Sequence, residues 1–254
     1  PMPPSSWAWH HGTHVAGLLG ATTDNNRGVA SSCFDCSILS VKVSDENQQN
    51  EVYITDGYDG ILYAAKVGFY RTDRGFSIIN NSWGSLYYNI FEQATIAVAH
   101  NDYNAIIIAA AGNDHVDAAH YPSSYDCKNI ISVAASDSSD RLASFSCYGK
   151  NSVDLAAPGV RILSLLPNNK TASWSGTSMA TPHVAGAAAL IFSVNPNAGY
   201  AEVKEAIMSS VDPVKAFEGK MMAAGRLNVA KSLGGVNSTW ITVSPNKGTV
   251  PAGR

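Results

Sequence analysis

A serine at the start of a long apolar run is the first residue that could act as a nucleophile. Ser178 lies in GTSMATP, residues 176–182, and a run of mostly small, apolar residues continues to about residue 193. A helix beginning here would present unpaired N–H groups and the positive end of its dipole beside the serine. Those groups would stabilise an oxyanion next to Ser178. The alternative is that Ser178 only caps the helix, a common role of serine.

Two histidines near the start of the chain are candidates for a general base. His11 and His14 lie in HGTHVAG, residues 11–17, and histidine is the side chain best suited to proton transfer near neutral pH. Two alternatives remain open. The pair could bind a metal, although no acidic residue lies between them as in the zinc-protease helix motif. Either residue could instead be a hydrogen-bonded core histidine.

An asparagine follows the most apolar stretch of the chain. The run AIIIAAA, residues 105–111, leads directly into Gly112 and Asn113. Such a run is typical of a central parallel strand buried on both faces, and open α/β sheets bind ligands at the carboxyl ends of their strands. The Asn113 amide could donate to an oxyanion at that edge. Taken alone, an asparagine here is more often a turn residue.

The elements that must position these residues alternate along the chain. The patterns predict strands over 37–43, 76–80, 105–111 and 129–135, and helices over 11–21, 55–67, 89–100, 177–193 and 201–210. This alternation predicts an α/β fold with a mostly parallel central sheet and helices on both faces. After about residue 235 the sequence becomes β-like and turn-rich. We therefore expect one domain over 1–234, and a linker with the start of a C-terminal β-sandwich module over 235–254.

Taken together and in this order, HGTHVAG, AAAGN and GTSMATPHVAG resemble the motifs of the subtilisin-like serine proteases. The segments NSWG, ASFS, APG and GRLN also fit, with Cys147 standing where the family often has another serine. The resemblance covers about residues 11–233. It implies a three-layer subtilisin-like fold and a serine endopeptidase that cleaves peptide bonds through an acyl-enzyme on Ser178. In that reading His11 is the general base, and the Asn113 amide and the Ser178 backbone N–H hold the oxyanion.

The resemblance also implies how a peptide substrate would bind. Residues 82–84 would run beside the substrate backbone as an extended strand, and Ala110 and Gly112 would form walls of the primary pocket. We hypothesise that His120, just before a Tyr-Pro pair, shortens that pocket and makes it more polar; a surface histidine is the alternative. The implied substrate-binding residues are Ser82, Trp83, Gly84, Ala110, Gly112 and His120.

The sequence departs from the family pattern at the third member of the triad. The family has an Asp at the end of an early core strand, some tens of residues before the histidine, and none of the ten residues before His11 is acidic. We expect a chain truncated ahead of His11, weak or inactive without that Asp. The alternative is a pseudoprotease that binds peptides without cleaving them.

Composition limits the remaining functions. The 254-residue chain has a net charge of −3 and 45% hydrophobic residues, which favours a globular domain and gives no reason to expect nucleic acid as a partner. No apolar run reaches the length of a membrane span. We expect a secreted or cell-surface monomer acting on proteins or peptides.

The cysteines and possible metal sites allow several interpretations. Four cysteines favour two disulfides, Cys33–Cys36 and Cys127–Cys147, with free thiols or a zinc or redox site as alternatives. The expected reaction requires no cofactor. Structural calcium is a further expectation with unassigned ligands; the candidates are the turn at residues 24–26 and the region of Asp126 with Asp154.

Overall fold

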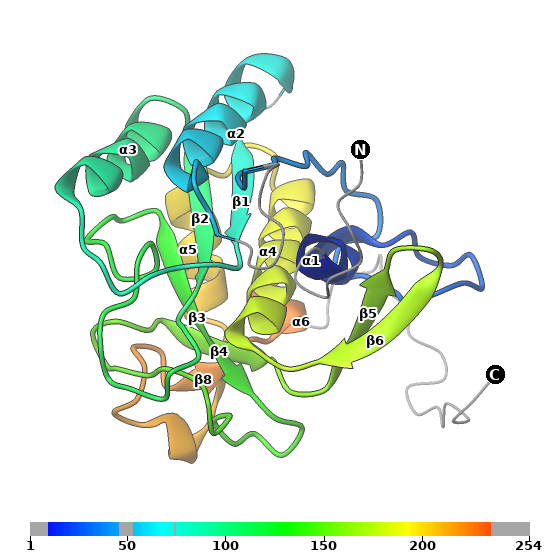
Figure 1. Cartoon of the computed structure of the whole chain (residues 1–254), viewed down its shortest axis with the longest axis vertical. Coiled ribbons are helices and arrows are strands. Elements are labelled where there is room, and N and C mark those ends of the chain that lie inside the picture. Colours follow the sequence, from blue (N-terminus) through cyan, green and yellow to red (C-terminus); the bar gives the residue numbers. More distant parts are fainter. Residues whose placement is uncertain (1–9, 46–52, 74, 235–254) are drawn as a thin grey trace.

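The computed structural model describes residues 10–45, 53–73 and 75–234 (Figure 1). Its helices are α1 (His11–Gly20), α2 (Gly57–Arg71), α3 (Ile90–Asn101), α4 (Thr177–Val194), α5 (Tyr200–Met208) and α6 (Val229–Ser232), with a 3-10 turn at Lys215–Phe217. Its strands are β1 (Ser77–Asn81), β2 (Ala105–Ala110), β3 (Ile130–Ser136), β4 (Leu155–Pro158), β5 (Ile162–Leu166), β6 (Lys170–Trp174), β7 (Asp212–Pro213) and β8 (Gly225–Arg226).

A six-stranded sheet in the order β1-β2-β3-β4-β8-β7 forms the centre of the molecule. The pairs from β1 to β8 are parallel, and β7 runs antiparallel to β8. Every residue of β2 and β3 is buried, as expected of parallel strands covered on both faces. The predicted mostly parallel α/β sheet is confirmed.

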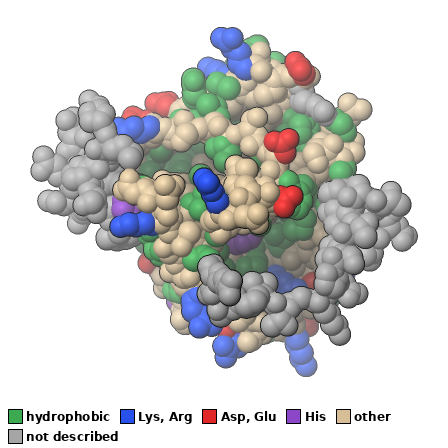
Figure 2. Space-filling model, turned by 90° about the vertical axis from the view of Figure 1, so that its right-hand side faces the viewer, with side chains coloured by type: hydrophobic (Ala, Val, Ile, Leu, Met, Phe, Trp, Pro, Cys, Tyr) green, Lys and Arg blue, Asp and Glu red, His purple; other side chains and the backbone are tan. Residues whose placement is uncertain are grey.

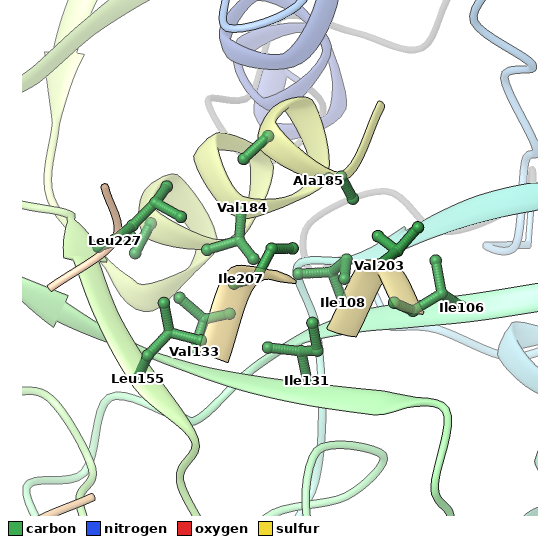
Figure 3. Close-up of a cluster of buried hydrophobic side chains, with 14 of the residues drawn as sticks. Ile106, Ile108, Ile131, Val133, Leu155, Val184, Ala185, Val203, Ile207 and Leu227 are labelled. Atoms are coloured by element: carbon green, nitrogen blue, oxygen red, sulfur yellow. The ribbon is translucent and has the colours of Figure 1, made fainter. Parts of the chain in front are cut away.

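Alternate residues of the central strands face two different helical layers. Ile106 and Ile108 of β2 pack with Val184 of α4 and with Val203 and Ile207 of α5 (Figure 3). The neighbouring positions of β2 join a second cluster with α2 and α3, formed in part by Ile107, Ala109, Ile61, Ala65, Ile96 and Ala99. This alternation follows from the two-residue period of a strand and confirms the three-layer arrangement.

Helix α4 is the central element of the core. It packs against α1 and against strands β1 to β4, and twelve of its residues are buried. Its small residues permit close approach: a Cβ added to Gly186 would lie 2.3 Å from the Cβ of Ser32. Within the described residues, α4 is the one helix whose length and composition would suffice to cross a membrane, and here it is a core helix.

The predicted strand over residues 37–43 is wrong. These residues form no strand; instead, Val41 and Val43 lie against Gly60 of α2, and the Val43 carbonyl accepts hydrogen bonds from the N–H groups of Thr55 and Asp56. A strand needs a hydrogen-bonded neighbour, and β1, at the edge of the described sheet, pairs with β2 alone. Strand β4, the short strands β7 and β8, the β5–β6 hairpin and helix α6 were not predicted. The expectations for residues 1–9 and 235–254 lie outside the described residues.

The cysteines divide into one bonded pair and two free thiols. Cys33 and Cys36 form a disulfide, as expected, but the predicted Cys127–Cys147 bond is wrong. The two side chains pack in different hydrophobic clusters. Burial, followed by the nearby Asp126 charge, raises the pKa of Cys127 to about 11, so its thiol stays protonated at neutral pH.

Candidate active site

Ser178 lies inside the first turn of α4. The helix is capped by Gly176, so the alternative role of Ser178 as the N-cap is wrong. Ser178 Oγ donates to the Ser82 carbonyl at 3.1 Å, and Ser82 Oγ donates to the Ser178 carbonyl at 2.9 Å. The two serines are 96 residues apart in sequence, and their reciprocal bonds join the start of α4 to the segment that follows β1.

Pro182 explains why the Ser178 carbonyl is free to accept that bond. In an α-helix this carbonyl would accept from the N–H of the residue four positions on, and proline has no N–H. The Ser82 hydroxyl supplies the missing donor at 2.9 Å. The proline inside α4 therefore creates the acceptor that fixes Ser82 beside Ser178.

Asn113 is held at the N-terminus of α4 by its side-chain oxygen. Asn113 Oδ1 accepts from the Thr177 backbone N–H at 2.9 Å and from Thr177 Oγ1 at 3.0 Å. With the oxygen turned toward Thr177, the NH₂ group of the same amide is directed away from it. The preceding Gly112 has φ +108°, a conformation that favours glycine and turns the chain out of the sheet at this point.

His11 is the first residue of α1, and α1 packs against α4 (Figure 1). Burial lowers the pKa of His11 below its ordinary value of 6.5, and the neighbouring His14 lowers it further. The imidazole is therefore neutral at pH 7 and able to accept a proton. The sequence placed His11 at the start of a helix, and the structure adds the burial that keeps it neutral.

His14 is a core histidine. It is fully buried, its Nε2 lies 2.9 Å from the Ala172 carbonyl, and its ring stacks on Trp174 with centroids 4.5 Å apart. In the described part of the chain no group of three or more His, Cys, Asp or Glu side chains could hold a metal ion. Because Trp174 precedes Ser178 by four residues, the stacked rings also tie α1, and so His11, to the chain that enters α4.

The segment after β1 is paired along one edge with Tyr121. Ser85 and Tyr121 form an antiparallel bridge through both of their backbone groups, at 2.8 and 2.7 Å. Backbone groups of successive residues point to opposite sides of a strand, so those of Gly84 face away from Tyr121. Trp83 packs on the other side against Tyr58 of α2, with ring centroids 5.5 Å apart.

His120 lies between Gly84, of the segment predicted to pair with the substrate, and Gly112, one predicted wall of the pocket. A Cβ on Gly84 would lie 2.5 Å from His120 Nδ1, and one on Gly112 would lie 2.8 Å from its Cδ2. The imidazole therefore touches both segments, while Ala110 is buried at the end of β2. Burial lowers the pKa of His120, against a smaller opposing effect of Asp114. Its buried Nδ1 has no hydrogen-bond partner among the described residues.

Two of the candidate contacts lie at the N-terminus of α4, and those of His120 lie outside this helix. Ser178 contacts Ser82, Asn113 contacts Thr177, and His120 contacts both Gly84 and Gly112. Among the described residues, the hydrogen bond of Ser178 Oγ goes to Ser82 and not to His11. Sequence reasoning missed three positioning residues: Thr177, Trp174 and Pro182. Of these, only Pro182 carried a local signal, because a proline within a helical pattern frees a carbonyl four residues earlier.

The two calcium candidates differ in their surroundings. Residues 24–30 line a hollow of about 320 Å³, and Asn25 Oδ1 there accepts from the Arg27 N–H at 3.0 Å. Asp154 is already engaged: one oxygen accepts from the Ser132 N–H at 2.7 Å and the other lies 3.9 Å from Lys204 Nζ. A carboxylate balanced in this way does not fit a shared site with Asp126, which lines a different hollow along α3.

Positive charge is dispersed on one face of the molecule. On the face with α1 and the β5–β6 hairpin, Lys and Arg side chains are scattered rather than gathered into one patch (Figure 2). A nucleic-acid site needs clustered positive charge, and this face offers none among the described residues.

Comparison with known proteins assigns the family. The model of the subtilase family matches residues 3–235. The chain is 40% identical over 219 residues to a thermophilic serine proteinase of Bacillus sp. (strain AK1), covering 86% of this chain and 51% of that protein. It is 40% identical over 223 residues to thermitase of Thermoactinomyces vulgaris, covering 88% and 74% respectively.

Solved structures agree with the fold. Proteases from Pseudoalteromonas arctica match with a TM-score of 0.75 at 29% identity, over 91% of this chain and 71% of theirs. The prenylagaramide maturation protease matches with a TM-score of 0.72 at 27% identity, over 91% and 84%. With a family model matched over nearly all of its length, the chain belongs to the subtilase family, and one relative named above is a serine proteinase.

Proposed function

We propose that the protein is a serine endopeptidase that hydrolyses peptide bonds through an acyl-enzyme on Ser178. The observation that carries this proposal is the arrangement at the N-terminus of α4. There Ser178 lies in the first turn, and the Thr177 bonds to Asn113 Oδ1 direct the amide NH₂ of Asn113 outward. A nucleophile beside a helix N-terminus and a fixed amide donor is suited to acyl transfer.

The proposed reaction uses His11 to move one proton twice. His11 removes the proton of Ser178 Oγ as this oxygen bonds to the scissile carbonyl carbon, and the carbonyl oxygen becomes an oxyanion. The Asn113 amide and the Ser178 N–H stabilise this charge. His11 then gives the proton to the leaving amine as the C–N bond breaks, and water releases the acyl group by the same steps. Before attack, Ser178 Oγ must leave the Ser82 carbonyl, its present acceptor.

Substrate binding in this proposal uses residues 82–84, which directly follow β1. The backbone groups of Gly84, which face away from Tyr121, would pair with the substrate backbone. The imidazole of His120, between Gly84 and Gly112, would shorten the primary pocket and make it more polar. His120→Gly should then broaden the cleavage profile on a peptide library toward larger side chains, and an unchanged profile would rule out this role.

A peptide-binding pseudoprotease is the second candidate, favoured by one observation. Among the described residues, the pKa of His11 is shifted by burial and by His14, and no carboxylate contributes to this shift. The triad Asp that orients the imidazole and stabilises its cation is therefore unassigned in this chain.

Labelling by a fluorophosphonate probe separates the two functions. The test uses the full-length protein encoded by the gene, with Ser178→Ala as the control. Labelling that disappears in the control supports the endopeptidase. A folded full-length protein that remains unlabelled supports the pseudoprotease.

The remaining parts of the proposal concern location and ligands. We propose a secreted or cell-surface monomer acting on protein or peptide substrates; one relative, 39% identical, is named a cell wall-associated protease of Bacillus subtilis. The proposed chemistry uses side chains and backbone groups and calls for no cofactor. Calcium bound by oxygens of residues 24–30 would be structural, and added calcium should then raise the midpoint of thermal unfolding in an Asp24-dependent way.

A further inference from the structure

The segment at residues 86–91 exposes large apolar side chains close in sequence to residues 82–84, which are proposed to pair with the substrate. It begins two residues after Gly84 and connects β1 to α3 (Figure 1). Five of its six side chains are large, apolar and exposed, with Tyr87 at 83% and Phe91 at 80%; the set is Leu86, Tyr87, Tyr88, Ile90 and Phe91. Exposed apolar side chains scattered singly are ordinary, whereas such a concentration marks an interaction site.

The backbone of this segment is fixed although its side chains are exposed. The Ser85–Tyr121 bridge holds one end. In the middle, the Tyr88 ring packs against Tyr121 and Tyr125 at centroid distances of 5.5 and 5.6 Å. The other end begins α3, where Asn89 Oδ1 accepts from the Phe91 N–H at 3.0 Å. A surface held in this way loses little conformational entropy when a partner binds.

The position of the segment identifies the part of a substrate that would reach it. Ser82 contacts Ser178, so the chain moves away from the nucleophile as it passes Gly84 toward Phe91. A substrate paired antiparallel to residues 82–84 would approach Ser178 with its scissile bond and extend past Gly84 with its N-terminal side. At about 3.3 Å per residue, that side reaches the segment about five to eight residues before the cleaved bond.

The chemistry of the segment indicates an uncharged, apolar ligand. Residues 85–91 contain no charged side chain. The first carboxylate after them, Glu92, accepts a hydrogen bond from the Tyr125 hydroxyl at 2.7 Å. Aromatic side chains supply large contact area with few rotatable bonds, which favours binding of other aromatic and long aliphatic groups.

We propose that residues 86–91 form an extended substrate-binding surface for aromatic or long aliphatic residues several positions N-terminal to the cleaved bond. This inference rests on the proposed endopeptidase function, because it requires a substrate peptide paired with residues 82–84. It assigns to the protein a preference for unfolded polypeptides with an apolar stretch upstream of the cleavage site.

Peptide binding to the Ser178→Ala full-length protein tests the proposal without cleavage. Two fluorescent ten-residue peptides share the same four residues before the bond and differ upstream, one carrying Phe and Leu and the other Ser and Gly. We expect the apolar peptide to bind about tenfold more tightly by fluorescence anisotropy, the gain from burying roughly one large side chain. The double variant Tyr87→Ser/Phe91→Ser should remove this difference and leave the affinity for the polar peptide unchanged.

The control is Tyr63→Ser, which removes an exposed aromatic ring (55% exposed) from α2 and should preserve the tenfold difference. Equal affinities of the original protein for the two peptides would overturn the proposal, as would an undiminished difference in the double variant. A double variant that alters only self-association in sedimentation would also overturn it and indicate contact between copies of the chain. Absence of fluorophosphonate labelling instead counts against the endopeptidase function, so the two failures are distinguishable.

Discussion

Asn113 combines a structural role and a proposed catalytic role that two substitutions can separate. Its Oδ1 accepts two hydrogen bonds from Thr177, and its NH₂ group is the proposed oxyanion donor. Asn113→Asp gives a side chain of nearly the same shape, which keeps an acceptor oxygen and removes the amide donor. Asn113→Ala removes both groups, so the first change should affect catalysis alone and the second should affect catalysis and stability.

The expected magnitudes follow from the contacts of Thr177. This residue is fully buried, so Asn113→Ala leaves its N–H and hydroxyl without their acceptor, and we expect a loss of about 1–3 kcal/mol in the free energy of unfolding. The free energy of unfolding of Asn113→Asp should equal or exceed that of the original protein, because the variant keeps the acceptor and places negative charge at the N-terminus of α4. Losing one oxyanion donor from subtilisin, a member of this family, lowers turnover on the order of 10²–10³-fold, and we expect a loss of that order in both variants.

Two assays keep the effects apart. Urea unfolding followed by tryptophan fluorescence gives the stability, with Ser178→Ala added to every variant to prevent self-cleavage. Hydrolysis of a short peptide ester by the full-length protein gives kcat and KM for each variant with Ser178 intact. The expected pattern is two variants with similarly reduced kcat, of which only Asn113→Ala is destabilised.

Either of two results would refute this reasoning. If Asn113→Asp retained kcat within a few-fold of the original, the amide NH₂ would not stabilise the transition state. If Asn113→Ala unfolded at the original free energy, the bonds from Thr177 would contribute nothing to stability, and the N-terminus of α4 would be held by other contacts.

Three further predictions follow from other contacts. Because burial lowers the pKa of His11 below 6.5, kcat/KM should fall with decreasing pH only through a midpoint below 6.5, and a midpoint above it in a pH–rate profile would contradict this. Trp174→Leu removes the ring stacked on His14 and should lower the free energy of unfolding in urea by about 1 kcal/mol beyond the lost apolar area. Asp212 pairs with Arg226 at 2.7 Å, and hydrogen bonds from its neighbours, that of Lys231 first, lower its pKa to about 2. The original protein should therefore have a higher free energy of unfolding than Asp212→Asn above pH 3.8, and this difference should disappear as the pH falls through about 2. Urea unfolding at several pH values can check this.

Helices α1 to α5 and strands β1 to β3 were predicted from local patterns, because burial leaves a periodic record in the sequence. The wholly apolar run at 105–111 predicted a central strand, and the structure places Ala105–Ala110 in the middle of the parallel sheet. The strand predicted over 37–43 shows the limit of such patterns, because a strand-like sequence was present and no strand formed. Its residues have strand-like preferences, but preference alone supplies no hydrogen-bonded neighbour among the described residues.

The cysteines and the short strands show a second limit. An even number of cysteines suggested two bonds, and only Cys33 and Cys36, three residues apart, are bonded. Cys127 and Cys147 are kept apart by the packing of separate clusters, which depends on the fold rather than on spacing. Strands β7 and β8 have two residues each, too few to leave a periodic pattern.

The sequence by itself determined the fold class and the family motifs, and it nominated Ser178, His11 and Asn113 as the proposed reactive groups, because helix and strand periods and short motifs are local properties of the chain. The tertiary structure alone decided how those groups are held. It selected His14 as a core residue by stacking it on Trp174, and it gave the carbonyl freed by Pro182 a donor from Ser82. These partners lie about a hundred residues or more apart along the chain. Contacts over such separations depend on how the layers pack, which no local pattern records.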